Sequence, residues 1–165
     1  METFRNLGIS SSLYLPYYGR ESEDFFEAQL NNSPRLEYVL LKDSWPETAE
    51  TLILRYLHSD KTRYFVIQDL ESSLKVTLPI LKAAFDSWYY LGSSWTSVQG
   101  PPGFSIEEIL SLPVPEDVWR VEDICYWAEG ESSLVRWSRP DGSCFKCEFM
   151  DNSTQSSSIA SSEDS

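Results

Sequence analysis

Residues 138–149 read SRPDGSCFKCEF, and this stretch decides the fold of the C-terminal third of the chain. The run Arg139-Pro140-Asp141-Gly142 suits a type I turn, because proline fits its second position and glycine supplies a left-handed bulge. A turn of this kind joins two antiparallel strands and fixes which residues lie opposite each other. The stretch therefore predicts a β-hairpin.

The register of this hairpin follows from the turn, which puts Arg139 opposite Ser143. Counting away from the turn, apolar residues meet apolar residues on one face and polar residues meet on the other, as a stable pairing requires. The predicted pairs are Trp137 with Phe145 and Val135 with Cys147 on the first face, and Ser138 with Cys144 and Arg136 with Lys146 on the second.

Cys144 and Cys147 have a Cys-x-x-Cys spacing, which raises the question of a metal or redox site. Residues three apart on a strand point to opposite faces, so the two thiolates do not converge on one ion. A Cys3His zinc site, the alternative, would have to add Cys125 and the single histidine, His58. A redox pair needs a helix N-terminus to lower a thiol pKa, and none is predicted here. We expect neither metal nor cofactor.

Upstream of the hairpin, helical and strand-like patterns are mixed. Ser22 is predicted to cap the first helix, and Ser44 and Glu47 have the spacing of a capping box before the second. Helices are expected within residues 23–30, 43–60, 79–91 and 105–112, and strands at 35–42, 63–70, 117–128, 132–138 and 143–149. These elements predict an α+β fold with helices packed on a mixed sheet and a C-terminal three-stranded antiparallel meander, without an internal repeat.

Three segments are predicted to lack regular structure. The first 21 residues form an irregular N-terminal arm of a single globular domain over residues 1–151. Residues 92–104, GSSWTSVQGPPGF, are expected to be a loop because glycine, proline and serine dominate them. Residues 152–165 contain seven serines among acids and are expected to be a disordered tail.

The charge of the chain excludes some function classes. The 165 residues include 13 Lys and Arg but 26 Asp and Glu, which gives a formal net charge of −13. Phosphate backbones and anionic membranes attract cations, so we expect no direct nucleic-acid binding and no membrane association. No signal peptide or long apolar run is visible. We expect a cytoplasmic protein, or a nuclear one in a eukaryotic host.

Acidic residues are concentrated between residues 93 and 130, where Arg120 is the one basic residue. Acidic surfaces keep proteins dispersed, and they also steer basic partners toward a docking face. Both interpretations remain open. The seven acids are Glu107, Glu108, Glu116, Asp117, Glu122, Asp123 and Glu129.

Catalytic patterns are sparse. The chain contains a single histidine, His58, so a Ser-His-Asp arrangement for hydrolysis would have to use that residue. The sequence "GPPG" is not a phosphate-binding loop, because prolines stand where backbone N–H donors would be needed. The carboxylates occur as adjacent pairs, which do not converge on one substrate. We therefore predict no catalytic residues, and an enzyme is the minority interpretation.

The remaining signal is recognition of another protein. Aromatic residues are enriched at interface hot spots, because they bury a large area with few rotatable bonds. We predict a small acidic protein that binds a basic partner, as an inhibitor or antagonist of the immunity, host-factor-binding or nucleic-acid-mimic type. A small enzyme or ligand carrier with a pocket under residues 92–104 is the alternative. The candidate partner-binding residues are Tyr17, Tyr18, Trp95, Phe104, Glu107, Glu108, Glu116 and Asp117.

Overall fold

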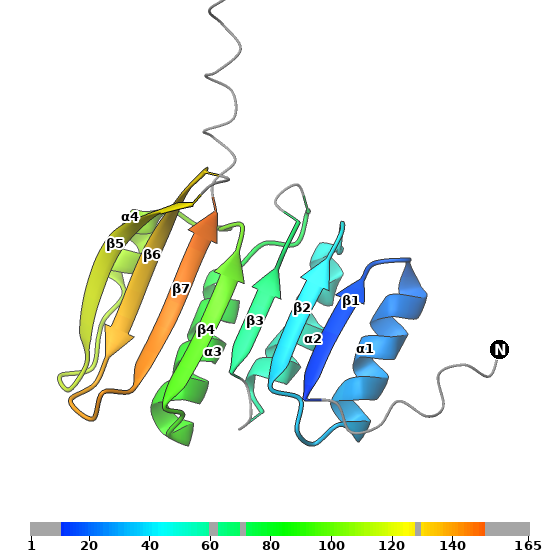
Figure 1. Ribbon diagram of the computed structural model, residues 1–165, viewed down its shortest axis with the longest axis horizontal. Helices are drawn as coiled ribbons and strands as arrows, with labels where there is room; N and C mark the ends of the chain where they lie inside the picture. The colour runs from blue at the N-terminus through cyan, green and yellow to red at the C-terminus, as the bar shows by residue number, and fades with distance from the viewer. Residues whose placement is uncertain (1–10, 60–62, 70–71, 128–129, 151–165) are drawn as a thin grey trace, which may run out of the picture.

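The computed structural model describes residues 11–59, 63–69, 72–127 and 130–150, with the backbone alone for 123–127 and 130–131. Within these ranges the chain forms a sheet with helices on one of its faces (Figure 1). The elements are β1 (Ser12–Pro16), α1 (Arg20–Asn32), β2 (Tyr38–Lys42), η1 (Glu47–Ala49), α2 (Glu50–Leu57), β3 (Tyr64–Ile67), α3 (Leu78–Leu91), β4 (Trp95–Gly100), α4 (Ile106–Ser111), β5 (Trp119–Trp127), β6 (Gly130–Ser138) and β7 (Cys144–Met150).

The sheet has seven strands in the order β1-β2-β3-β4-β7-β6-β5. The first four strands are parallel neighbours in chain order, and β7 pairs parallel with β4. Strands β5, β6 and β7 form the antiparallel meander. The predicted fold class, helices on a mixed sheet with a C-terminal meander, is confirmed.

The 138–149 hairpin has the predicted register. All four predicted pairs are present, including Trp137 opposite Phe145 and Arg136 opposite Lys146. Gly142 has a φ of 84°, the left-handed conformation that the turn requires. Its N–H donates to the Arg139 carbonyl at 3.0 Å, and the Arg139 N–H donates to the Ser143 carbonyl at 3.0 Å.

The parallel half of the sheet contains a structural repeat that the sequence reading missed. Ser12, Tyr38 and Tyr64 lie side by side on β1, β2 and β3, so two successive strand–helix units are each 26 residues long. Each unit places its helix on the same face and returns to the next strand position. The period is not continued, because the next step across the sheet, from Tyr64 to Ser97, is 33 residues.

The prediction of a loop at residues 92–104 is wrong, because residues 95–100 form β4, in the middle of the sheet. Pairing with β3 and β7 satisfies its backbone groups, and this tertiary pairing outweighs the glycine, proline and serine that dominate residues 92–104. Gly100 is required here by close packing. A Cβ on this residue would lie 3.0 Å from the Cβ of Ile67.

Two further predictions near the N-terminus are corrected. Residues 12–16, expected within an irregular arm, form the edge strand β1, and α1 begins at Arg20. Ser22 is therefore a buried residue of the helix and not its cap. Its Oγ accepts a hydrogen bond from the Tyr18 N–H at 2.9 Å and donates to the Pro16 carbonyl at 3.1 Å. Residues 1–10 and the predicted tail, 152–165, lie outside the described residues.

The capping box is at a different helix from the one predicted. Pro46 precedes η1 without a side-chain cap, and the Ser44 hydroxyl donates to the Asp69 carboxylate at 3.0 Å. The reciprocal capping bonds are made at α4, between Ser105 and Glu108. They fix the start of a helix that is only 6 residues long.

The core lies between the sheet and the helices. Its largest fully buried side chains include Trp45, Trp88 and Phe145. The Trp45 Nε1–H donates to the Leu15 carbonyl at 3.1 Å, so this indole ties the segment after β2 to the edge strand. In the part of the chain that the structure describes, no helix is long and apolar enough to cross a membrane.

The two cysteines of the hairpin should differ in reactivity. Cys147 faces the core, where burial raises the pKa of its thiol well above the usual value, whereas Cys144 is partly exposed on the other face. We expect iodoacetamide to modify Cys144 in the native protein and Cys147 only after denaturation. Tryptic cleavage after Lys146 separates the two cysteines for mass spectrometry. Equal labelling of both in the native protein would contradict the register.

Candidate protein-binding surface

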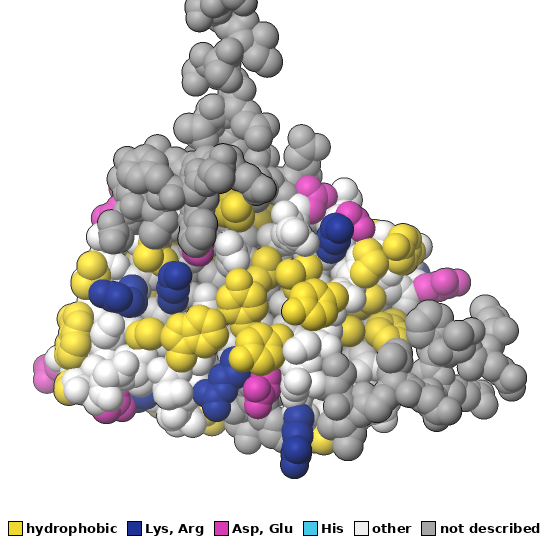
Figure 2. Space-filling model, in the orientation of Figure 1, with side chains coloured by type: hydrophobic (Ala, Val, Ile, Leu, Met, Phe, Trp, Pro, Cys, Tyr) yellow, Lys and Arg dark blue, Asp and Glu magenta, His cyan; other side chains and the backbone are white. Residues whose placement is uncertain are grey.

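One face of the sheet carries no helix. Figure 2 views this helix-free face and shows hydrophobic side chains gathered across its middle, with Lys and Arg side chains among them. Nine large hydrophobic side chains are exposed in the described residues, and five of them project from strands toward this face. Exposed apolar area concentrated in one place is typical of an interaction site. The five are Tyr14, Tyr38, Trp95, Trp119 and Val121.

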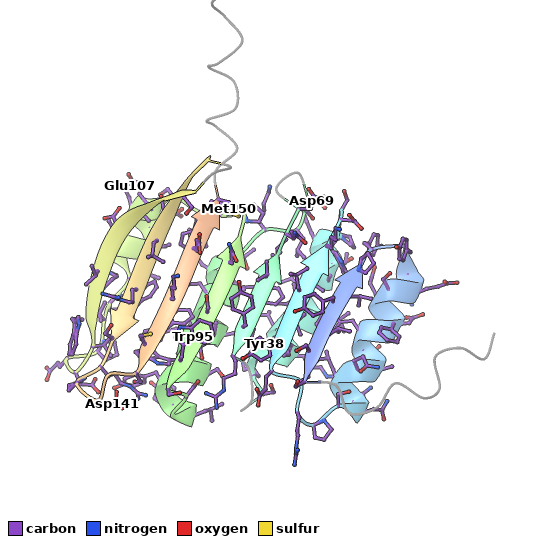
Figure 3. All side chains as sticks on the ribbon, in the orientation of Figure 1. Tyr38, Asp69, Trp95, Glu107, Asp141 and Met150 are labelled. Carbon is purple, nitrogen blue, oxygen red and sulfur yellow. The ribbon has the colours of Figure 1, made fainter. Side chains whose placement is uncertain are left out.

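Three aromatic side chains form a contiguous row on this face. The ring centroids of Tyr38 and Tyr64 are 6.2 Å apart, and those of Tyr64 and Trp95 are 6.0 Å apart with an interplanar angle of 12°. Tyr38 and Trp95 remain 40% and 37% exposed, and both lie near the starts of their strands (Figure 3). We call Tyr38, Tyr64 and Trp95 the aromatic row. Tyr64 and Trp95 are stacked, whereas the Tyr38 ring is tilted by 48° from that of Tyr64.

A pair of cations lies beside the aromatic row. Arg136 on β6 and Lys146 on β7 are directly opposite each other, and neither has a hydrogen-bond or ion-pair partner among the described residues. Like charges opposite each other across an antiparallel pair are destabilising. We call Arg136 and Lys146 the cation pair. It is an unusual arrangement in a chain of net charge −13.

Two residues of the aromatic row, Tyr38 and Tyr64, share one line across the sheet with the cation pair, whereas Trp95 lies two residues before that line on β4. Tyr38, Tyr64, Ser97, Lys146 and Arg136 are successive partners on β2, β3, β4, β7 and β6. Strands are about 4.8 Å apart, so Tyr64 and Lys146 are separated by about 10 Å. The residue between them, Ser97, is small and 4% exposed. The line therefore has an apolar half and a cationic half.

A polar network supports the row from the side. The Tyr64 hydroxyl donates to the Gln99 side-chain oxygen at 2.9 Å. Burial raises the pKa of Tyr64, and the nearby carboxylate of Glu148 raises it further, so Tyr64 stays protonated and remains a donor at neutral pH. Glu148 itself is 6% exposed and accepts a hydrogen bond from the Ser132 hydroxyl at 3.1 Å. These contacts hold the Tyr64 ring in place.

The aromatic residues selected from the sequence lie in three different places. Trp95 belongs to the aromatic row. Phe104 lies on the helix side of the sheet, where its ring is 5.1 Å from that of Phe149. Tyr17 and Tyr18 lie between β1 and α1, at the other edge of the sheet from β5, and the Tyr17 ring packs 5.1 Å from Trp45.

The four selected acids lie on α4 and on the connection that follows it. Glu107 and Glu108 are exposed on α4, where Glu108 also completes the capping box. Glu116 and Asp117 are exposed between α4 and β5, and Asp117 accepts a hydrogen bond from the Tyr89 hydroxyl at 2.9 Å. The selected residues therefore do not form one surface with Trp95.

The helix-free face includes residues that the sequence reading did not select, namely Tyr38, Tyr64, Arg136 and Lys146. The hairpin register did place the two cations opposite each other. The absence of an ion-pair partner for Arg136 and Lys146, however, is determined by the residues on the neighbouring strands, which the hairpin sequence does not specify. Tyr38 and Tyr64 come together only through the parallel pairing of β2 with β3.

A groove opens on the opposite, helical side of the molecule, with a volume of about 630 Å³. This groove is not the pocket predicted under residues 92–104. Residues 95–100, expected to be part of a loop covering that pocket, form strand β4. The groove lies between α3 and residues 112–115, and Trp137 and Phe145 form its floor. In the described part of the chain, no group of three or more His, Cys, Asp and Glu side chains is arranged to hold a metal ion.

No protein-family model, curated protein or solved structure matches this chain.

Proposed function

We propose that the protein is a protein-binding module whose helix-free sheet face binds an acidic, partly apolar segment of a partner protein. The observation that carries this proposal is the cation pair, two facing cations without a carboxylate partner in the described residues, in line with Tyr38 and Tyr64 of the aromatic row. Such a pair costs stability in the free protein. An acidic group from a partner would remove that cost.

The distance between the apolar half and the cationic half of this line predicts the spacing of side chains in the partner segment. An apolar side chain over Tyr64 and an acidic group at Lys146 would lie about 10 Å apart, which is about three residues of an extended chain. Ser97, which lies between them, is small and 4% exposed, so its side chain does not project into the path of the partner's backbone. The preferred segment therefore carries an aromatic or aliphatic residue about three positions from an Asp or Glu.

Single-stranded nucleic acid is the other polyanion that aromatic and cationic side chains can bind. A net charge of −13 opposes the approach of a long phosphate backbone, whose binding depends on many cations. A short acidic peptide needs only the two charges of the cation pair. The net charge of the chain therefore favours a protein partner over a nucleic acid. If the protein is an inhibitor, it acts by occupying the acidic segment of that partner.

Selection from a random-peptide display library tests this function without knowledge of the natural partner. We expect the wild-type protein to enrich peptides with an Asp or Glu about three residues from an aromatic or aliphatic residue. The same library should give no such enrichment on a protein with Tyr38→Ser and Arg136→Ser. Absence of acidic peptides from the wild-type selection, enrichment of oligonucleotides in a parallel selection, or enrichment of the same acidic peptides by both proteins would contradict the proposal.

The cost of the cation pair gives a separate prediction about stability. Arg136→Glu converts a repulsive cross-strand pair with Lys146 into an attractive one, which should raise the free energy of unfolding by up to about 1 kcal/mol. For a chain of this size, Tm should then rise by about 2–4 °C in a thermal melt. The control is Arg35→Glu, the same charge change at an exposed turn residue. A lower Tm for Arg136→Glu than for the control would contradict an unpaired Arg136.

A further inference from the structure

The groove on the helical side of the molecule lies between α3 and the segment that follows α4. Helix α3 covers β4 and β7, and the short α4 lies at the far end of the helix layer, toward β5 (Figure 1). Trp137 of β6 and Phe145 of β7 lie at the bottom of the groove but are only 3% and 0% exposed, because Phe85 and Trp88 of α3 pack on them. The open apolar surface of the groove is therefore on its walls, and it is separate from the helix-free face on the other side of the sheet.

The dimensions of the groove match a helix. Its α3 wall runs from Leu78 to Tyr90, nearly the whole of α3, which corresponds to about 18 Å at the rise of an α-helix. A helix of about 12 residues has the same length. Leu78, Leu81 and Phe85 of this wall recur at helical spacing, and such a stripe on one helix packs against the stripe of a neighbour.

Exposed apolar side chains continue beyond the groove onto its rim. Tyr90 is 74% exposed and Leu112 is 38% exposed, and they line opposite walls. Leu91, next to Tyr90 at the end of α3, is 50% exposed. A small ligand in the groove would leave this rim uncovered. A helix from a partner would cover both walls and both rims, in the mode by which amphipathic helices bind apolar grooves.

The charges around the groove are predominantly acidic. Glu116 and Asp117 follow Pro115 of one wall, and Asp86 lies on the other. The nearest cations are engaged within the protein. Lys82 pairs with Asp86, Arg120 donates to the C-terminal carbonyls of α4, and Arg139 donates to the Tyr89 carbonyl. Glu116 has no such partner in the described residues.

We infer that this groove binds a basic amphipathic helix of a partner protein. The apolar face of the helix lies on Phe85 and Tyr90 of α3 and on Leu112 of the opposite wall, and its Lys or Arg side chains reach Glu116 and Asp117. This site has the opposite charge preference to the helix-free face and lies across the sheet from it. The protein can therefore hold an acidic segment on one face and a basic helix on the other.

The test is a display library of amphipathic helices of about 14 residues, with Leu or Phe on one face and Lys, Glu or Ser at each flanking position. We expect Lys-flanked clones to be enriched, and their affinity to fall at least tenfold with Tyr90→Ser plus Leu112→Ser. Glu116→Gln plus Asp117→Asn should slow their association and make it less sensitive to salt. Asp117→Asn keeps an acceptor for the Tyr89 hydroxyl, so the fold should be preserved.

Arg136→Ser plus Lys146→Ser is the control, because it changes the helix-free face and should leave helix binding unchanged. This control also separates failure of the groove from failure of the proposed function. Enrichment of Glu-flanked clones by the Arg136→Ser plus Lys146→Ser protein, binding of Lys-flanked clones that tolerates the groove variants, or binding only of a small apolar dye such as ANS would overturn the inference.

Discussion

Val98→Asp is expected to prevent folding, at a cost of more than about 4 kcal/mol in the free energy of unfolding. Val98 is fully buried on β4, between Phe65 of β3 and Cys147 of β7. A carboxylate at this position would face the core without a partner. Because typical domains are stable by about 5–15 kcal/mol, circular dichroism should show an unfolded or severely destabilised chain.

Ser94→Asp is the matched control for this prediction. It introduces the same charge four residues earlier, at an exposed position just before β4, and should change stability by less than about 0.5 kcal/mol. Comparison of the two variants distinguishes between two structures for residues 95–100: a buried central strand, and the surface loop that the composition of residues 92–104 indicates. A Val98→Asp protein that melts near the wild-type temperature would mean that the segment is a loop.

Loss of the cation pair should have the largest effect on binding. Removal of one partner of a desolvated charge pair costs about 2–5 kcal/mol, so Arg136→Ser plus Lys146→Ser should weaken binding of the selected acidic peptide at least about thirtyfold. Isothermal titration calorimetry measures this change directly. The thermal stability of the double variant should equal or exceed that of the wild type, because the repulsion between the two cations is removed.

The charge-matched control carries Arg20→Ser plus Lys82→Ser, which removes one arginine and one lysine from exposed positions on α1 and α3. If peptide binding depended only on net charge, this control would weaken it as much as the cation-pair variant does. An equal loss of peptide affinity in the two double variants would therefore contradict binding of the acidic group by Arg136 and Lys146.

The sequence was sufficient for the C-terminal hairpin because its determinants are local. Pro140 and Gly142 specify the turn, and the alternation of apolar and polar residues on either side of it specifies the register. The same is true of α3, which ends at Gly92 in the left-handed conformation expected of a C-terminal glycine. Where the determinants are within a few residues, the prediction and the structure agree.

Strands β1 and β4 could not be predicted in this way, because their pairing partners are distant in sequence. Residues 95–100 are a strand only through contact with β3 and with β7, the last strand in the chain. The 26-residue repeat was hidden for a related reason. Equivalent core positions hold different apolar residues, Leu13, Val39 and Phe65, which share a direction in the sheet but no sequence identity.

The helix-free face was only partly accessible to sequence reasoning. Trp95 was selected as an aromatic anchor, and the hairpin register already put Arg136 opposite Lys146. The total charge of the chain directed attention to acids, whereas the unsatisfied charge on this face is positive. Tyr38 and Tyr64 join Trp95 only once the parallel strands are aligned.

Site-specific photo-crosslinking of the selected acidic peptide tests most directly whether the helix-free face is the binding surface. A photoreactive phenylalanine analogue replaces Tyr38 in one protein and Tyr18 in another. Tyr18 is the more exposed of the two, at 81% against 40%, but it lies outside the aromatic row. We predict crosslinks from position 38 and none from position 18. Crosslinks from position 18 alone, or equally from both positions, would contradict a binding site on this face.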